Sequence, residues 1–236
     1  MSTLPASIAR REFLEFGQRR RALIIKMAFP LVVGLPLLTS AAPSFYAAMA
    51  LTMLITIIGA LGTGAVFSRD RAVGMQVRYR LLPRRQGVVL LERLTASAAI
   101  DLLQLAPILV LLAIRHPAAA RWWPALLLTV AGMVLCANVV GALASTFTTQ
   151  PGEVMLYVLL PLLPAFYLAG VFAPITTPLQ HVASVLLPMT YLHDALLGAL
   201  QGSPRLTMGA AAAGGAVTLV LSVIAALASG RRVLET

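Results

Sequence analysis

Long apolar runs recur along the chain, separated by short polar or charged stretches. The hydrocarbon core of a membrane is roughly 30 Å thick and is crossed by about 20 helical residues. Of the 236 residues, 59% are hydrophobic and only 11% are charged, which leaves no room for a soluble domain beside the apolar runs. We therefore predict an all-α polytopic membrane protein, with residues 1–236 forming a single transmembrane domain.

The apolar runs predict six transmembrane helices. They cover about 23–41, 46–67, 94–114, 123–146, 154–172 and 206–229. The segment 173–205 is too apolar for an ordinary loop, and Pro174, Pro178, Pro188 and Pro204 interrupt it too often for a straight span. We expect a re-entrant or interfacial pair of helices there, with its backbone polar groups satisfied by protein or by a wet cavity.

The stretch "IARREFLEFGQRRRALI" (8–24) precedes the first run. It places Ala9, Phe13 and Phe16 on one helical face, with charged residues elsewhere, which is typical of an amphipathic helix lying in the membrane interface. Such a helix connects to a partner at the surface or acts as a passive anchor, and the sequence leaves both open. A polar, charged stretch before the first span is unlike a cleavable signal peptide, so we expect mature sequence.

The basic residues are divided unequally between the two sides of this topology. Fifteen of the 18 Lys and Arg residues lie in the N-terminal segment, the 68–93 loop and the C-terminal end. The remaining three are Arg115, Arg121 and Arg205. Positive residues are retained in the cytoplasm, so both termini and the 68–93 loop are predicted to be cytoplasmic. Orientation explains the net charge of +10 better than nucleic-acid binding does, and we expect no nucleic-acid partner.

The loop after the second span reads "SRDRAVGMQVRYRLLPRRQG" (68–87) and carries six arginines against one acid. A simple reading is that it fixes topology and meets anionic lipid. Its internal order suggests more, because Gly74 ends or bends a helix, and apolar Leu81 and Leu82 precede Pro83.

The order Arg69-Asp70-Arg71-Ala72-Val73-Gly74, followed by Pro83, resembles the Arg-Glu-Arg-Glu-x-Gly…Pro pattern of type-2 ATP-binding-cassette exporter permeases. In that family the segment is the coupling helix, which contacts the ATPase. Ala72 and Val77 depart from the pattern, since acids are common at these places. The resemblance implies that coupling to the ATPase rests on Arg69, Asp70, Arg71, Gly74, Arg78 and Pro83.

A second stretch, "LAGVFAPITTPLQHVASVLLPMTYLHDALLG" (168–198), is similar to the extracellular segment of the same family. Leu197 departs from it, because an arginine often closes that motif. The matching residues are Gly170, Pro174, Pro178, Pro188, Tyr191 and Asp194.

The two matches together resemble the small drug- and antibiotic-exporting permeases most. The resemblance implies a homodimer working with two copies of a separate ATPase, which holds ATP and Mg²⁺, in the plasma (inner) membrane of a bacterium. It further implies outward movement of a hydrophobic or amphipathic small molecule, such as a drug, an antibiotic, a lipid or a lipid-like peptide, by alternating access. The chain itself has no Gly-x-x-x-x-Gly-Lys-Ser/Thr loop, and the glycines of "GALGTG" (59–64) follow no strand, so they are predicted to be helix-packing positions.

Polar and aromatic residues within the spans are candidates for a translocation path. Asp101 and Gln104 line such a path or mark a subunit contact; alternatively, Asp101 pairs with Arg93 or Arg69. Asn138 is expected to form a hydrogen bond between helices rather than bind substrate. The remaining candidates, for which ordinary packing is the alternative, are Met53, Phe67, Met155, Tyr157, Phe166 and Phe172.

Neither a metal site nor catalysis is expected in this chain. His116, His181 and His193 have no carboxylate or cysteine at metal-ligand spacing, Cys136 is the single cysteine, and no nucleophile and base form a pair. Two alternatives to a small-molecule exporter remain: a polysaccharide or haem exporter of the same fold, and an ATP-independent carrier or membrane scaffold. A carrier should show inverted repeats and coupling-ion carboxylates, for which Asp101 is the only candidate.

Overall fold

The structure is a computed structural model that describes residues 20–39, 43–81, 83–117, 122–201 and 206–235. Within these ranges it is helical, without β-strands. The α-helices are α2 (Arg20–Thr39), α3 (Ser44–Ala72), α4 (Met75–Arg80), α5 (Gln86–Arg115), α6 (Trp123–Ala144), α7 (Pro151–Leu168), α8 (Pro178–Leu186), α9 (Pro188–Gln201) and α10 (Met208–Glu235), and a 3₁₀ turn, η2 (Ser145–Phe147), follows α6. The predicted all-α class is confirmed.

Among the described residues, five helices are long and apolar enough to cross a membrane: α3, α5, α6 with η2, α7 and α10. The pair α8 and α9, bent by 91° at their junction, would be a sixth if counted as one broken span. The predicted first span corresponds to α2, whose apolar part is Met27–Pro36. The multi-pass membrane architecture is therefore confirmed. The predicted interfacial helix at 8–24 lies largely outside the described residues, which begin within α2.

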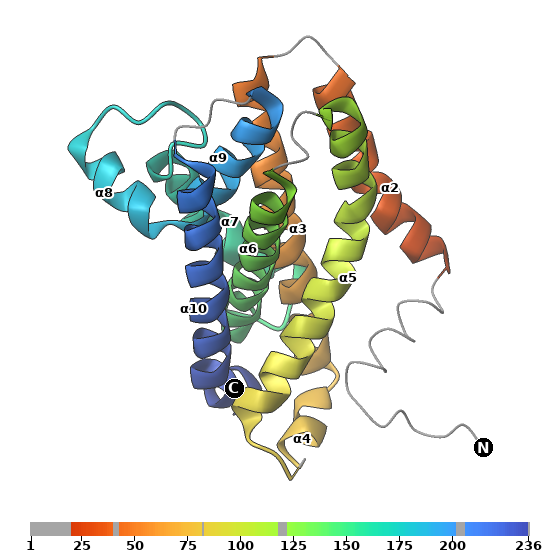
Figure 1. The fold of residues 1–236 in the computed structure, drawn as a ribbon. Coiled ribbons are helices and arrows are strands. Elements are labelled where there is room, and N and C mark those ends of the chain that lie inside the picture. Colours follow the sequence, from red (N-terminus) through yellow and green to blue (C-terminus); the bar gives the residue numbers. More distant parts are fainter. Residues whose placement is uncertain (1–19, 40–42, 82, 118–121, 202–205, 236) are drawn as a thin grey trace.

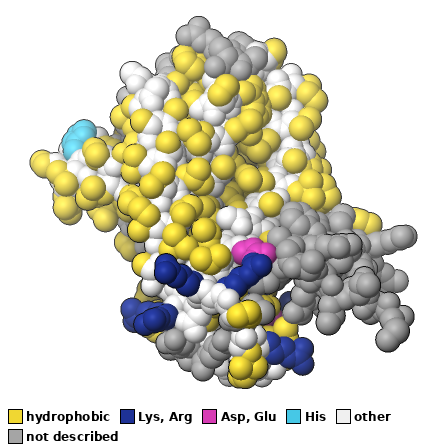
Figure 2. Space-filling view, turned by 60° about the horizontal axis from the view of Figure 1, so that its bottom comes forward, with side chains coloured by type: hydrophobic (Ala, Val, Ile, Leu, Met, Phe, Trp, Pro, Cys, Tyr) yellow, Lys and Arg dark blue, Asp and Glu magenta, His cyan; other side chains and the backbone are white. Residues whose placement is uncertain are grey.

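Figure 1 shows α3, α5, α6 and α10 side by side, with α4 and the C-terminal end of α10 at one end of the molecule. The pair α8 and α9 lies at the opposite end. Figure 2 turns the end with α4 forward and shows that the described Lys and Arg side chains gather at this end, next to a mainly hydrophobic surface. We call this the charged end.

The helices approach most closely where glycine faces a neighbouring backbone. A Cβ atom at Gly141 of α6 would overlap the carbonyl oxygen of Ala60 in α3, and one at Gly59 would lie 2.9 Å from Oδ1 of Asn138. Lipid tails are as apolar as the helix surfaces, so association depends on such close packing rather than on the hydrophobic effect. The prediction that Gly59 and its neighbours serve helix packing agrees with this contact.

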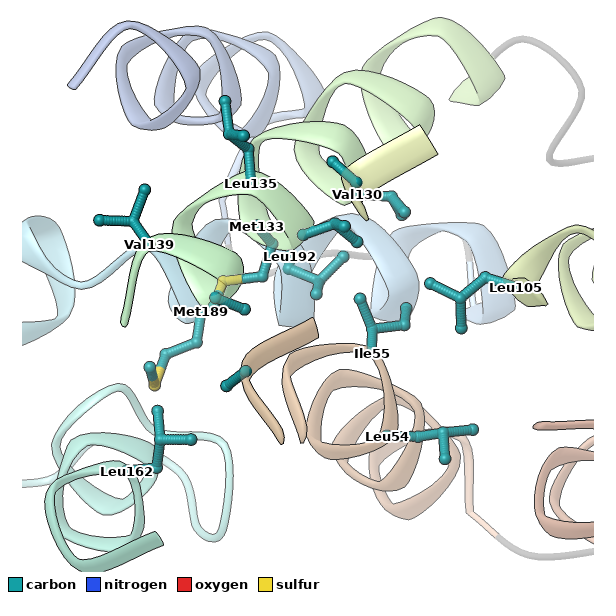
Figure 3. Close-up of a cluster of buried hydrophobic side chains, with 14 of the residues drawn as sticks. Leu54, Ile55, Leu105, Val130, Met133, Leu135, Val139, Leu162, Met189 and Leu192 are labelled. Carbon is teal, nitrogen blue, oxygen red and sulfur yellow. The ribbon is translucent and has the colours of Figure 1, made fainter. Parts of the chain in front are cut away.

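The core includes α9 as fully as it includes the long helices. Figure 3 shows Met133 of α6 next to Leu192 of α9, and Met189 of α9 near Leu162 of α7. Helix α9 contacts α3, α6 and α10, whereas α8 stays on the outside of the bundle.

Prolines begin both helices of this pair. Thr177 and Gln180 form a capping box at the start of α8, with Pro178 in its first turn. Leu187 is extended, as expected before a proline, and Pro188 then begins α9. The predicted helical pair within 173–205 is confirmed, and its side of the membrane stays a prediction.

Candidate functional site

The arginine-rich loop folds as the last turn of α3, a glycine turn and the short helix α4. Gly74 has a φ angle of 69°, and its N–H donates to the carbonyl oxygen of Arg71 at 2.9 Å. Glycine is the residue that takes this left-handed conformation without strain. Gly74 therefore ends α3 and turns the chain into α4.

The first turns of α5 supply a buried arginine that anchors this segment. Arg93 is 2% exposed and forms an ion pair with Asp70 at the end of α3, with 2.5 Å between Nη2 and Oδ2. Its guanidinium carbon lies 4.2 Å from the ring centre of Phe67 and 4.6 Å from that of Tyr79. A planar guanidinium that is paired with a carboxylate and stacked on aromatic rings is a stable way to bury this charge. Arg93 thus holds α3, α4 and α5 together.

A second set of contacts joins the same region to α10. Nη2 of Arg71 donates to the carbonyl oxygen of Val233 at 2.9 Å. The backbones of α5 and α10 touch at Gly87 and Gly230, where an added Cβ on either glycine would overlap the other helix. The ends of α3 and α10 and the start of α5 are therefore fixed to one another at the charged end.

One face of this segment points away from the molecule. Val77 and Leu81 are 58% and 79% exposed, and their four-residue spacing places them on one side of α4. Val73, just before the Gly74 turn, is 67% exposed. Tyr79, in contrast, is buried against Arg93. An exposed apolar stripe on a helix beyond the apolar spans is typical of a protein-docking surface.

The coupling residues predicted from the sequence divide into two groups. Arg69, Gly74, Arg78 and Pro83 are exposed around the apolar stripe. Asp70 and Arg71 instead make the internal contacts with Arg93 and Val233. We refer to Arg69, Val73, Val77, Arg78 and Leu81 together as the docking surface.

Sequence reasoning missed the anchoring roles of Arg93 and Tyr79. Arg93 was considered for the charge balance and as a partner of Asp101, whereas the structure pairs it with Asp70. The available signal was its position in the first turns of an apolar helix, where a charge is expensive unless it has a partner.

The polar candidates for a translocation path lie inside the bundle. Asp101 and Gln104 are buried on α5, and Oδ1 of Asp101 would lie 3.8 Å from a Cβ atom at Gly62 of α3. Asn138 is fully buried at the contact between α6 and Gly59 of α3. Asn138 thus lies between two helices, but among the described residues neither its Oδ1 nor its Nδ2 has a hydrogen-bond partner, so the expected hydrogen bond between helices is not seen.

The apolar candidates are spread over different parts of the molecule. Phe67 stacks on Arg93 at the charged end, and Phe166 contacts Phe172 with 5.8 Å between ring centres. Met155 and Tyr157 are 49% and 46% exposed on the outside of α7. Met53 is partly buried against the core. One copy of the chain therefore does not bring these residues into a single path.

The extracellular motif organises the turn between α7 and α9. Gly170 has a φ angle of 72° and ends α7, and Oγ1 of Thr190 donates to the carbonyl oxygen of Ala169 at 3.2 Å. The hydroxyl of Tyr191 donates to the carbonyl oxygen of Val185 at 2.5 Å, which fixes α8 against α9. Asp194 is fully buried in α9.

The prolines of this motif lie closer to the surface. Pro174 and Pro178 are exposed, and Pro188 is half-buried at the bend between α8 and α9. The motif residues described by the structure therefore surround the turn and the bend, where they set the backbone path rather than gather into a catalytic cluster.

Two apolar cavities open on the side of the bundle. One, of about 670 Å³, lies between α5 and α6 and is lined by residues such as Leu109, Val110 and Trp123. The other, of about 650 Å³, lies between α6, α10 and the bend of α8 and α9, and Tyr191, Thr218 and Ser222 add hydroxyl groups to an otherwise apolar wall. Within the described ranges, no group of three or more His, Cys, Asp or Glu residues is arranged to hold a metal ion.

Comparison with known families shows that residues 6–200 match a family model described as "ABC-2 type transporter". Comparison with curated proteins finds no significant match. Comparison with solved structures finds none either.

Proposed function

The chain belongs to the ABC-2 type transporter family, and from this premise we propose that it is the permease subunit of an ATP-driven exporter. Residues 1–236 act as one permease domain. ATP and Mg²⁺ are held by a separate ATPase, which performs the hydrolysis. The permease moves a hydrophobic or amphipathic small molecule outward, and no bond of that molecule is broken.

The observation that carries this proposal is the docking surface. A separate ATPase needs a contact that is exposed yet rigidly joined to the spans. The stripe of Val77 and Leu81 on α4, together with Val73 before the Gly74 turn, meets the need for exposure, because each of these apolar side chains is more than half exposed. The Arg93 anchor supports a rigid connection to the spans, because it ties α4 to α3 and α5.

The proposed mechanism is alternating access. ATP binding brings two ATPase copies together, and each moves the α4 that is docked on it. Rigid side-chain packing transmits such a movement as a body rotation rather than absorbing it. The charged end then closes while the opposite end opens.

We propose that two copies of the chain form the pathway. Helix α7 supports this, because it has the smallest buried share of the five candidate spans, 22% of its most apolar window. Leu156, Leu160 and Tyr157 are 69%, 77% and 46% exposed on it. A second copy packed on this face would bring the exposed candidates Met155 and Tyr157 to the interface.

The substrate class is proposed from the shape and chemistry of the cavities. Both have volumes within the range of small-molecule sites and mainly apolar walls. The hydroxyl groups of Thr218 and Ser222 in the second cavity favour a molecule with one polar part. These features support a drug, an antibiotic, a lipid or a lipid-like peptide.

The orientation is proposed from the charges. The arginines of α4 and its flanks lie at the charged end, which the positive-inside rule places in the cytoplasm. Both termini are then cytoplasmic, α8 and α9 face the outside, and the protein spans the inner membrane of a bacterium.

The test of the proposal is affinity purification from native membranes in mild detergent, followed by mass spectrometry of the proteins that stay bound. We expect a soluble ATPase with a phosphate-binding loop. It should be lost from the variant Val77→Asp/Leu81→Asp, because a carboxylate on each exposed site opposes burial in an apolar contact.

The control is Arg115→Glu, which changes an exposed charge at the opposite end of α5. The ATPase should remain bound to the Arg115→Glu protein. If the unaltered chain is recovered folded but without any bound ATPase, from membranes in which the ATPase is present, the proposed function is contradicted.

A further inference from the structure

A third cavity lies at the charged end and is lined by none of the residues of the docking surface. It has a volume of about 680 Å³ and lies between the start of α5 and the end of α10. Arg84, Arg85 and Arg231 line it together with Gln86, Gly87 and Leu227. We call it the basic cleft.

The positive charge of the basic cleft is only partly balanced by protein. Arg84 lies 3.4 Å from Glu92, and its side chain is 61% exposed. In the part of the chain that the structure describes, neither Arg85 nor Arg231 forms an ion pair. Two exposed guanidinium groups therefore remain available for an anion, and guanidinium groups bind phosphate oxygens in pairs.

The floor of the basic cleft is backbone. The contact between Gly87 and Gly230 brings α5 and α10 together without side chains between them. The first turn of α5 begins at Gln86, so its free N–H groups lie beside the arginines. The cleft combines these N–H groups with guanidinium groups from the residues just before α5 and from α10.

An apolar stripe continues from the basic cleft along α10. Leu227, Ile224, Val220 and Val217 are each more than 40% exposed. Their spacing of three and four residues places them on one face of the helix. A cationic pocket at the end of an exposed apolar stripe has the two chemical parts that a phospholipid requires.

We propose that the basic cleft binds the headgroup phosphate of an anionic phospholipid in the leaflet at the charged end. The phosphate contacts Arg85 and Arg231, and the acyl chains lie along Leu227 and Ile224 of α10. Basic pockets between membrane helices bind anionic headgroups in this manner. Binding there does not require the ATPase.

The experiment uses the purified whole chain in detergent and native mass spectrometry with added lipid. The probes are phosphatidylglycerol, phosphatidylcholine and inorganic phosphate. The cleft variant is Arg85→Gln/Arg231→Gln. The matched control is Arg69→Gln/Arg78→Gln, which removes the same charge from exposed positions of the docking surface at the same end.

We expect tighter binding of phosphatidylglycerol than of phosphatidylcholine. An arginine near an anionic membrane surface contributes roughly fivefold in affinity, so the cleft variant should bind phosphatidylglycerol about 25-fold more weakly. The control should keep its affinity for this lipid, and inorganic phosphate alone should bind weakly, because it makes no contact with the apolar stripe.

Three results would overturn the proposal. Equal loss in the cleft variant and the control would indicate a general charge effect rather than a site. Binding of inorganic phosphate as tight as that of the lipid would indicate a free-phosphate site. If lipid binding is unchanged and the cleft variant loses the ATPase in the affinity purification from native membranes, the cleft is a protein contact. None of these results depends on whether the chain exports a substrate.

Discussion

Arg93 shows how a single residue can determine the geometry of a surface that it does not reach. Its charge is removed from water, which is unfavourable unless a partner replaces the lost hydration. Asp70 and the rings of Phe67 and Tyr79 supply that replacement. Because these partners come from α3 and α4, satisfying the charge also fixes where α4 points.

Replacing Arg93 with leucine should destabilise the protein, because Asp70 then loses its cation. Breaking a buried ion pair by removing one partner costs about 3 kcal/mol. The measurement is the apparent melting temperature of the detergent-solubilised chain. The double variant Arg93→Leu/Asp70→Leu should recover part of the lost melting temperature. A double variant whose melting temperature falls by more than the two single variants' losses added together would contradict the pairing.

Gly74 allows a test that separates folding from coupling. Its φ angle of 69° favours glycine, yet a Cβ atom there would meet nothing within 4 Å. Gly74→Val should therefore strain the turn by roughly 1–2 kcal/mol and change the direction of α4, while the bundle stays folded.

The measurement for Gly74 is ATP-dependent transport set against melting temperature. Gly74→Asn is the control, because asparagine tolerates this backbone conformation better than valine does. Equal transport by the valine and asparagine variants would show that the turn does not matter for coupling.

At the residue scale, the sequence predicted the exposed arginines better than the buried one. Arg78 is exposed on the short helix α4 and Arg69 in the last turn of α3, and the charged loop sequence around them indicates such positions. The partner of Arg93 could not be chosen in this way. Asp70 and Asp101 were both acids near the end of a span, and only the packing of α3 on α5 decides which one the arginine meets.

At the scale of the elements, hydropathy predicted the existence of the helices better than their ends. The expected second span ended at residue 67, whereas α3 continues to Ala72. Hydropathy marks where apolar residues stop, but a helix continues through polar residues until its backbone is interrupted. Here the interruption is Gly74, which the sequence did indicate as a helix end.

The seam between α3 and α6 is the element contact most sensitive to side-chain size. Gly141→Val should push the helices apart, because even a Cβ atom there overlaps the backbone of Ala60 and Gly64. We expect a large loss of folded protein, because overpacking lowers the free energy of unfolding by about 1–3 kcal/mol or more.

The control for the seam is Gly152→Ala, since a Cβ atom at Gly152 would meet nothing within 4 Å. This change should leave stability the same or raise it slightly, because alanine restricts the unfolded chain. Size-exclusion profiles and thermal unfolding in detergent measure both variants. A well-folded Gly141→Val protein would show that the two helices can separate without loss.

At the scale of the whole molecule, the sequence predicted where the charges lie but not how the candidate path residues are arranged. Among the described residues, Lys and Arg side chains gather at the charged end, where the 68–93 loop and the end of α10 carry them. The path candidates were chosen one by one for their chemistry, and they lie on several faces of the bundle. A path formed between two copies would depend on an interface that the pattern of a single chain does not describe.

Orientation can be measured with a membrane-impermeant maleimide. Cys136 is the single cysteine and would be replaced with alanine. In that background, His181→Cys on α8 should be labelled in intact cells, whereas Arg78→Cys on α4 should be labelled only after the membrane is opened. The positive-inside rule gives this order, and the reverse order would contradict the proposed topology.

The Arg93 anchor also affects how the protein is made. Asp70 and Arg93 are 23 residues apart, and Tyr79 lies between them in the chain. All parts of the anchor are therefore present as soon as the ribosome has synthesised the start of α5, well before α6 to α10. Contacts between residues close in sequence form fastest, since little chain entropy is lost in closing them. The surface that we propose for the ATPase is thus expected to mature early in translation, as a hairpin that the later helices join.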